Sequence, residues 1–305
     1  MTVAQIQATQ SGEKKEYWRW EESSWVDEAK NWRDAKFVTA GIDVGSVSSQ
    51  AVVVCDGELY GYSSMRTGNN SPDSATNAIN GVLEKSGMKL EDVTYVIGTG
   101  YGRVNVPFAH KAITEIACHA RGANYMGGRG IRTILDMGGQ DCKAIHCDEK
   151  GKVTNFLMND KCAAGTGRFL ETMASALQVP LEELGECALR APEAVRVSST
   201  CTVFAETEVV SHIARGKKRD EILLGVCQSI VDRIAAMVRG IGIKSPVAMT
   251  GGVAKNQAVV KLMGERLGLP VFLPPEPQIT GALGAALIAR QDALTRQKPL
   301  AALNG

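Results

Sequence analysis

The chain has 305 residues, enough for two domains of ordinary size, and its hydrophobic content of 44% and charged content of 22% are typical of a soluble globular protein. Its 34 basic and 33 acidic side chains leave a net charge of +1, which offers no field to attract nucleic acid or an anionic membrane. Because no apolar run approaches the roughly 20 residues that span a bilayer, and no signal peptide is apparent, we expect a cytoplasmic protein whose eight cysteines form no disulfides.

Residues 1–36 form an unusual N-terminal arm. All four tryptophans of the chain fall in it, at Trp18, Trp20, Trp25 and Trp32. Tryptophan is enriched at interface hot spots, so we predict that residues 17–32 dock onto another chain. The alternative is that the arm packs on its own protein.

A three-strand unit follows the arm. An apolar strand over residues 37–46 ends in Asp43 and a glycine turn, and strands over 48–55 and 58–65 come next. Asp56 and Gly57, between the last two strands, are a strong hairpin signal. After this unit we expect a helix over residues 74–86, a strand over 93–97 and a helix over 110–121.

The same unit then returns. A strand ends in Asp136 and a glycine turn, and strands over 141–147 and 152–158 follow, with a turn at Gly151 between them. Asp43 and Asp136 are 93 residues apart, and Gly57 and Gly151 are 94 apart. An offset kept to within one residue predicts an internal duplication.

Two cysteines in the second half each follow small polar residues and precede a predicted helix: Cys162 before residues 169–177, and Cys201 before 203–213. We expect both thiols at helix N-termini, where the helix dipole favours a thiolate or a bound metal–sulfur cluster. An iron–sulfur cluster normally takes four thiolates, so a cluster here would need a second chain. The alternative is that both cysteines are small buried hydrophobic residues.

The remaining elements are a long helix over residues 220–240, a third strand with a glycine turn over 247–252, a short strand over 270–277 and a final helix beginning at 281–289. The small residues of that last helix suit close packing. A carboxylate at the end of a strand, beside the exposed backbone N–H groups of a turn, suits a magnesium ion that bridges to phosphate. Asp43 and Asp136 are therefore the candidate magnesium ligands, while Gly251 and Gly252 admit a flat ligand.

The three turns resemble the phosphate and adenosine motifs of the actin, sugar-kinase and Hsp70 ATPase superfamily, at residues 41–50, 135–143 and 249–256. The resemblance implies a duplicated, actin-like (RNase H-like) α/β fold with two domains around a nucleotide cleft. The predicted domains are residues 37–132 with 275–295, and residues 133–274, which carry the two cysteines. The candidate catalytic residues are Asp43, Asp136 and Gln140. The candidate nucleotide-binding residues are Gly45, Ser46, Val47, Gly138, Gly139, Gly251, Gly252 and Lys255.

A closer match involves residues 99–103, 136–141, 159–171, 198–208, 250–254 and 281–289. These segments look like the activator ATPases of 2-hydroxyacyl-CoA dehydratases and the related ATPase subunits of benzoyl-CoA reductase. The resemblance implies a dimer, with an identical or paralogous subunit, that shares one four-iron four-sulfur cluster ligated by Cys162 and Cys201 from each side. It also implies that hydrolysis of magnesium-ATP drives an electron from a ferredoxin-type donor through the cluster into a partner iron–sulfur protein that reduces an acyl-CoA.

One position departs from that pattern, because Gln50 stands where many activators carry lysine near the end of the first phosphate motif. This variant and the N-terminal arm lead us to predict a benzoyl-CoA reductase subunit. The alternatives are a homodimeric dehydratase activator, a small-molecule kinase of the same fold with structural cysteines, and a regulator that binds ATP and senses redox state.

Overall fold

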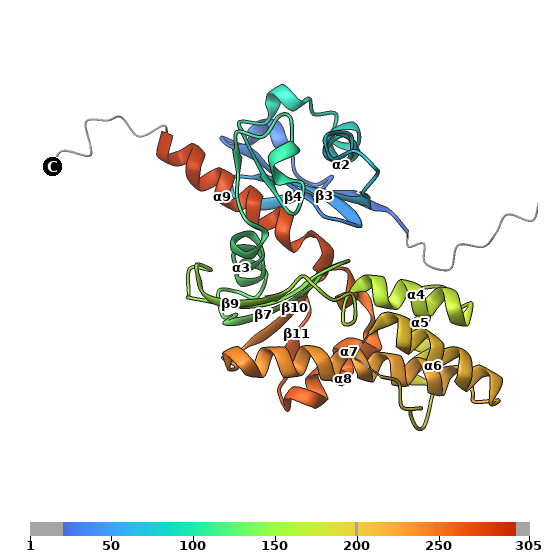
Figure 1. Ribbon diagram of the computed structural model, residues 1–305. Helices are drawn as coiled ribbons and strands as arrows, with labels where there is room; N and C mark the ends of the chain where they lie inside the picture. The colour runs from blue at the N-terminus through green and yellow to red at the C-terminus, as the bar shows by residue number, and fades with distance from the viewer. Residues whose placement is uncertain (1–20, 199–200, 297–305) are drawn as a thin grey trace, which may run out of the picture.

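Two β-sheets, each at the centre of one lobe, organise the computed structural model, which describes residues 21–198 and 201–296 (Figure 1). The sheet of the first lobe has the order β1-β4-β3-β2-β5-β6, and that of the second has the order β11-β10-β7-β8-β9. The first sheet consists of β1 (Ser23–Val26), β2 (Val38–Val44), β3 (Ser48–Cys55), β4 (Glu58–Arg66), β5 (Tyr95–Thr99) and β6 (Lys111–Ala112). The second consists of β7 (Thr133–Met137), β8 (Cys142–Cys147), β9 (Val153–Asn159), β10 (Val247–Thr250) and β11 (Val271–Phe272).

The two sheets repeat one pattern. Apart from β1, the order β4-β3-β2-β5-β6 in the first lobe matches β9-β8-β7-β10-β11 in the second. The central strand of each sheet pairs antiparallel with the strand after it and parallel with a later one. Asp43 lies opposite Gln50 in the first sheet, and Asp136 lies opposite Lys143 in the second. The predicted duplication and the actin-like fold are confirmed.

Two helices lie between the sheets, as Figure 1 shows: α3 (Glu115–Met126) and α9 (Thr280–Arg296). Helix α9 packs on β2, β3 and β5 of the first sheet, and α3 packs on α9 and touches β7, β8, β9 and β10 of the second. The two helices approach so closely that a side chain at Gly284 would overlap the backbone carbonyl of Cys118. The small residues predicted for the last helix therefore serve close packing, and α3 is held firmly against both lobes.

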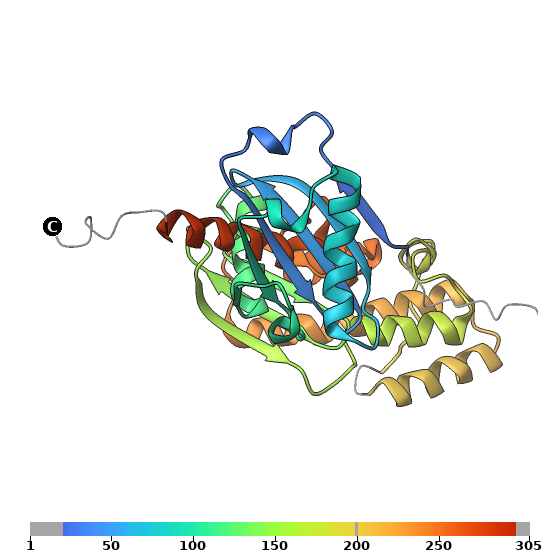
Figure 2. The ribbon, with the colours of Figure 1, turned by 90° about the horizontal axis from the view of Figure 1, so that it is seen from above.

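The outer faces of the sheets are covered by the other helices. Figure 2 shows α2 (Ser71–Ser86) lying across the first sheet, on the face opposite α9. The second lobe contains α4 (Gly167–Leu177), α5 (Leu184–Leu189), α6 (Thr202–Ala214), α7 (Arg219–Ile241) and α8 (Gln257–Leu267). Their apolar faces form one large core with β7, β8 and β10. Within the described part of the chain, none of these helices has the length and apolar character needed to cross a bilayer.

The helix predicted from residue 110 begins only at Glu115. The backbone N–H groups of His110 and Ile113 donate to the carbonyls of Val96 and Gly98, so the residues between them form the edge strand β6. Pairing with a neighbouring strand has outweighed the local helical pattern. Helices α5 and α8 were not predicted from the sequence.

The described part of the N-terminal arm packs on the first lobe. Strand β1 pairs antiparallel with β4, and the indole N–H of Trp32 donates to the carbonyl of Ser86 over 3.1 Å. Val26 and Trp32 pack against the core of this lobe, whereas Trp25 is 42% exposed. This part of the arm therefore follows the alternative, in which it packs on its own protein. Trp18 and Trp20 lie outside the described residues.

Candidate functional site

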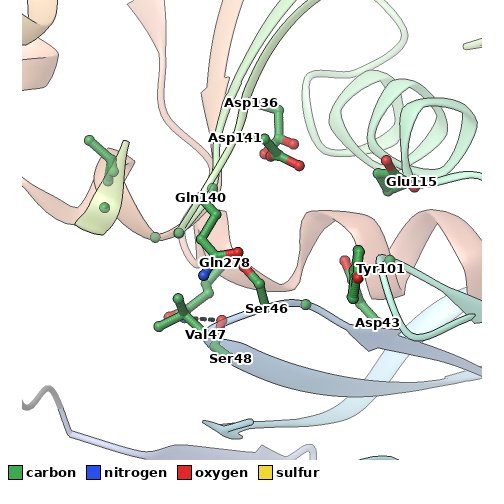
Figure 3. Close-up of a pocket in the computed structure, with 18 of the residues that line it drawn as sticks. Asp43, Ser46, Val47, Ser48, Tyr101, Glu115, Asp136, Gln140, Asp141 and Gln278 are labelled. Carbon is green, nitrogen blue, oxygen red and sulfur yellow. Dashed lines mark hydrogen bonds between the residues drawn. The ribbon is translucent and has the colours of Figure 1, made fainter. Parts of the chain in front are cut away.

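A pocket of about 420 Å³ lies between the two lobes, at the turns that follow β2, β7 and β10 (Figure 3). This volume is ordinary for a small-molecule site. Every residue predicted to bind or hydrolyse a nucleotide lines it: Asp43, Gly45, Ser46, Val47, Asp136, Gly138, Gly139, Gln140, Gly251, Gly252 and Lys255. The duplicated strands thus bring together residues more than 200 positions apart in the sequence.

The first two turns close in the same way and touch at their tips. The N–H of Gly45 donates to the carbonyl of Ser48 over 3.0 Å, and the N–H of Gly138 donates to that of Asp141 over 2.9 Å. A side chain at Gly139 would overlap that of Val47, so the turns approach each other closely. A change in the position of one turn must therefore displace the other.

The carboxyl groups of Asp43 and Asp136 are buried on opposite sides of the pocket, and their surroundings move their pKa values apart. Burial raises the pKa of Asp43 to about 6. Burial acts in the same direction on Asp136, but His119, Lys143 and the hydroxyl of Thr250 outweigh it, so its pKa is lowered. Asp136 is thus a stable anion at neutral pH, whereas Asp43 is an anion that gains from a nearby cation.

Lys143 supplies a buried positive charge that sequence reasoning missed. Its side chain is 3% exposed, and its Nζ lies 2.7 Å from Oδ1 of Asp141 and 3.5 Å from Oδ2 of Asp136. Burial lowers the pKa of Lys143, but the two carboxylates outweigh burial and raise it above its ordinary value. Lys143 occupies in the second sheet the place that Gln50 occupies in the first, where the Gln50 amide donates to Ser64.

The third turn is tied to the first. Gly251, whose φ of 84° lies in the region that favours glycine, donates its N–H to the carbonyl of Pro277. The side-chain amide of Gln278 then donates to the hydroxyl of Ser48 over 3.0 Å (Figure 3). Lys255 pairs with Glu276 at 3.1 Å on the same side of the pocket.

His119 of α3 is a second residue that sequence reasoning missed. Its ring is buried, with Nδ1 lying 3.1 Å from the hydroxyl of Thr250 and 3.3 Å from Oδ1 of Asp136. Its Nε2 faces Oδ2 of Asp43 at 3.8 Å. A lone histidine within a helix carries no local signal of such a position. Lys143 could have been found, because it stands at the duplicated position of Gln50.

Cys162 and Cys201 lie outside this pocket, and both are half-buried. Cys201 is the N-cap residue of α6, as predicted. The prediction that Cys162 lies at a helix start is wrong, since the N-cap of α4 is Thr166 and Cys162 belongs to the loop before it. The loop lies there because the hydroxyl and N–H of Thr166 both donate to the carbonyl of Ala163, forming a turn. Helices α4 and α6 nevertheless pack on each other.

Most of the other cysteines are poor candidates for metal ligands. Burial raises the pKa of Cys142 and Cys147 to about 11 and that of Cys118 and Cys227 to about 12, so these thiols stay protonated. Burial likewise raises the pKa of Cys55 to about 11.

The second turn of the pocket is bonded directly to α4. The backbone N–H groups of Gly167 and Arg168, at the start of this helix, donate to the carbonyls of Gly138 and Gly139, both over 2.9 Å. A side chain at Gly167 would lie 3.2 Å from the Cα of Gly139, tighter than usual contact. The first turn of α4, just after the Cys162 loop, therefore rests on the turn that lines the pocket.

Comparison with known proteins gives one family. The model of the BadF/BadG/BcrA/BcrD ATPase family matches residues 40–289. The chain is 47% identical over 256 residues to the activator of lactoyl-CoA dehydratase from Anaerotignum propionicum, covering 84% of this chain and 98% of the relative. It is 34% identical over 261 residues to a benzoyl-CoA reductase subunit from Thauera aromatica, covering 82% of this chain and 92% of the relative.

Solved structures agree. The activator of the 2-hydroxyisocaproyl-CoA dehydratase from Clostridium difficile, with bound ADPNP, matches with a TM-score of 0.81 and 41% identity, covering 86% of this chain and 97% of that one. A ROK family glucokinase from Streptomyces griseus, in complex with glucose and AMPPNP, matches with a TM-score of 0.52 and 15% identity, covering 83% and 99%. The second likeness is one of fold alone.

Proposed function

The chain belongs to the BadF/BadG/BcrA/BcrD ATPase family, and from this premise we propose that it is the ATP-hydrolysing activator of a 2-hydroxyacyl-CoA dehydratase. Its relatives favour this function over the benzoyl-CoA reductase subunit predicted from the sequence. Identity to the lactoyl-CoA dehydratase activator is 47%, against 34% to the benzoyl-CoA reductase subunit. Gln50, on which the benzoyl-CoA reductase prediction relied, is buried and bonded within its own sheet.

In this proposal the pocket binds magnesium-ATP. The first two turns cradle the phosphates, and the third turn, with Gly251, Gly252 and Lys255, accepts the adenosine. Gln140 lines the pocket on the second turn, and its amide, which can both donate and accept, orients the water that attacks the γ-phosphate. Lys143, fixed beside Asp136, offsets the negative charge of the site.

Asp43 and Asp136 fit a magnesium ion. Magnesium is usually held by one or two carboxylates together with waters and phosphate oxygens. The two aspartates are buried, come from opposite lobes and line the same pocket. The raised pKa of Asp43 marks a carboxylate whose charge is poorly compensated, and a cation at this place would offset that cost. When bound, the ion would neutralise the phosphate oxygens.

Cys162 and Cys201 fit one half of a four-iron four-sulfur cluster. They are the two half-buried thiols of the second lobe, one in the loop before α4 and one at the N-cap of α6, which packs on α4. Burial keeps four other thiols protonated. A four-iron four-sulfur cluster normally takes four thiolates, so a second chain would supply the other two. Within residues 21–198 and 201–296, no three His, Cys, Asp or Glu side chains are arranged to hold a metal ion. When bound, the cluster would supply a low-potential one-electron carrier.

The proposal rests mainly on the hydrogen bonds between the second turn of the pocket and helix α4, which follows the Cys162 loop. Closure of the lobes on a γ-phosphate would shift the second turn, which holds the N–H groups of Gly167 and Arg168. Helix α4 would then move as a body, and the Cys162 loop with it. Helix α6, which begins at Cys201, packs on α4 and would move with it.

The test is electron transfer that depends on ATP. The chain is purified without oxygen, reduced with dithionite and mixed with the dehydratase of an Anaerotignum or Clostridioides relative and its 2-hydroxyacyl-CoA substrate. We expect dehydration that requires both this chain and magnesium-ATP, and no reduction of benzoyl-CoA when benzoyl-CoA reductase lacking its own ATPase subunits is offered instead. If the chain supported benzoyl-CoA reduction by the reductase but no dehydration by the dehydratase, the benzoyl-CoA reductase subunit would be favoured instead.

A further inference from the structure

His119 lies where the three motifs of the pocket meet. Its ring contacts Asp136 of the second motif and Thr250 of the third, and it faces Asp43 of the first. The His119 side chain is 7% exposed, so these contacts are shielded from solvent. The two turns and the third strand are thereby linked through a single side chain that comes from none of them.

The backbone around His119 is held by the packing of α3 on α9. Helix α3 packs on α9, where side chains at Gly122 or Gly284 would overlap backbone of the opposite helix. A side chain at Gly281 of α9 would collide with Oδ2 of Asp43 and lie 2.8 Å from Nε2 of His119. The glycine therefore leaves the space in which the imidazole and the carboxylate face each other. This close packing holds the backbone of α3 around His119 in place against α9.

The hydrogen bonds assign a donor to the ring. The hydroxyl of Thr250 donates its single proton to Oδ1 of Asp136 over 3.2 Å, so its oxygen is left to accept. Nδ1 of His119 must then carry the hydrogen that it directs at Thr250 and Asp136. Asp136 thus receives a hydroxyl, an imidazole N–H and, at Oδ2, the ammonium of Lys143. These groups fix the direction in which its carboxylate can offer a lone pair.

We propose that His119 is a positioning residue that sets the geometry of the two magnesium-binding aspartates across the cleft. In this role it acts through the two carboxylates: it orients Asp136 and spaces Asp43 when the lobes close. The inference rests on the proposed function only in requiring a metal–nucleotide site, not on electron transfer or on the identity of the partner. Loss of such an orienting partner commonly costs about 10- to 100-fold in metal affinity or activity.

The experiment measures Mn²⁺ affinity by electron paramagnetic resonance in the presence of ADPNP, beside the kcat and KM of ATP hydrolysis. In His119→Ala we expect the dissociation constant for Mn²⁺ to rise about 10- to 100-fold and kcat to fall, while metal-free nucleotide binds with nearly unchanged affinity. His119→Asn, whose amide can donate from near the position of Nδ1, should recover most of the metal affinity. If the alanine variant does not fold, His119→Phe keeps a ring of similar size without its nitrogens and should show the same loss.

A matched control separates positioning from packing. His146 is also buried, on β8, where its Nε2 lies 3.1 Å from the carbonyl of Gly242. His146→Ala should lower the melting temperature but leave Mn²⁺ affinity at the wild-type value. Unchanged Mn²⁺ affinity in the His119 variants, or an equal loss in His146→Ala, would overturn the role of His119. Absence of Mn²⁺–ADPNP binding in the wild-type protein would instead refute the nucleotide site itself.

Discussion

Replacing Asp43 by asparagine tests whether the pocket is organised to receive a cation. The residue is 7% exposed, and burial raises its pKa from 3.8 to about 6. A rise of this size corresponds to about 3 kcal/mol of differential stabilisation of the protonated form. Because the folded pKa lies above the unfolded one, this carboxyl favours the folded state below about pH 4, and the contribution is lost as the pH rises through 6. Without ligand at pH 8, Asp43→Asn should raise the free energy of unfolding by up to about 3 kcal/mol.

The assay is urea denaturation of the protein in EDTA, without nucleotide, at pH 8 and again at pH 4. The stabilisation should be present at pH 8 and absent at pH 4, where the wild-type carboxyl is already protonated. Asp136→Asn is the contrasting variant, because the pKa of Asp136 is lowered and loss of its charge should destabilise the protein at pH 8. Both variants should lose magnesium-dependent ATPase activity. An Asp43→Asn protein that is no more stable than wild type at pH 8 would refute the inference that the Asp43 charge lacks compensation.

Three other sets of substitutions test separate parts of the site and the fold. The anaerobically purified Cys162→Ala and Cys201→Ala proteins should lose iron and form a weaker dimer. The Cys118→Ala protein, in which a buried cysteine is replaced, should do neither. Equal iron loss in all three would contradict the ligand assignment. Lys143→Met leaves Asp136 without its cation and should cost about 3–5 kcal/mol of unfolding free energy by urea titration, against less than about 1 kcal/mol for the exposed Lys89→Met. Trp32→Ala should lower the melting temperature more than the exposed Trp25→Ala, since only Trp32 loses both core packing and a hydrogen bond to Ser86. The reverse order would contradict the packing role given to Trp32.

The nucleotide side of the pocket could be predicted because its signal is local and repeated. A buried strand that ends in aspartate and glycine is recognisable in a few residues. Its return 93 positions later indicates that Asp43 and Asp136 occupy equivalent positions of a duplicated unit. All the residues predicted from these turns line the pocket. The predicted domain boundaries and the roles of the individual residues stay predictions.

The residues that the sequence did not reveal are those whose position depends on tertiary packing. His119 reaches the pocket only because α3 is held between the lobes by α9, and nothing near it in the sequence indicates this. The start of α3 was misplaced because strand pairing with β5 is a long-range contact. Cys162 was placed too close to a helix start because the turn closed by Thr166 is invisible in a pattern of small residues. The packing of Trp32 on the first lobe was not predicted because its partners, the core of that lobe and the carbonyl of Ser86, lie far from it in the sequence.

In the proposed function, two copies of this type of chain share one cluster through Cys162 and Cys201. Native mass spectrometry of the anaerobically purified protein tests it in one spectrum, because the mass gives the number of chains and the number of iron and sulfur atoms together. We expect a species of two chains with four iron and four sulfide, which is lost in Cys201→Ala. A single chain without iron from the same anaerobic preparation would contradict the claim.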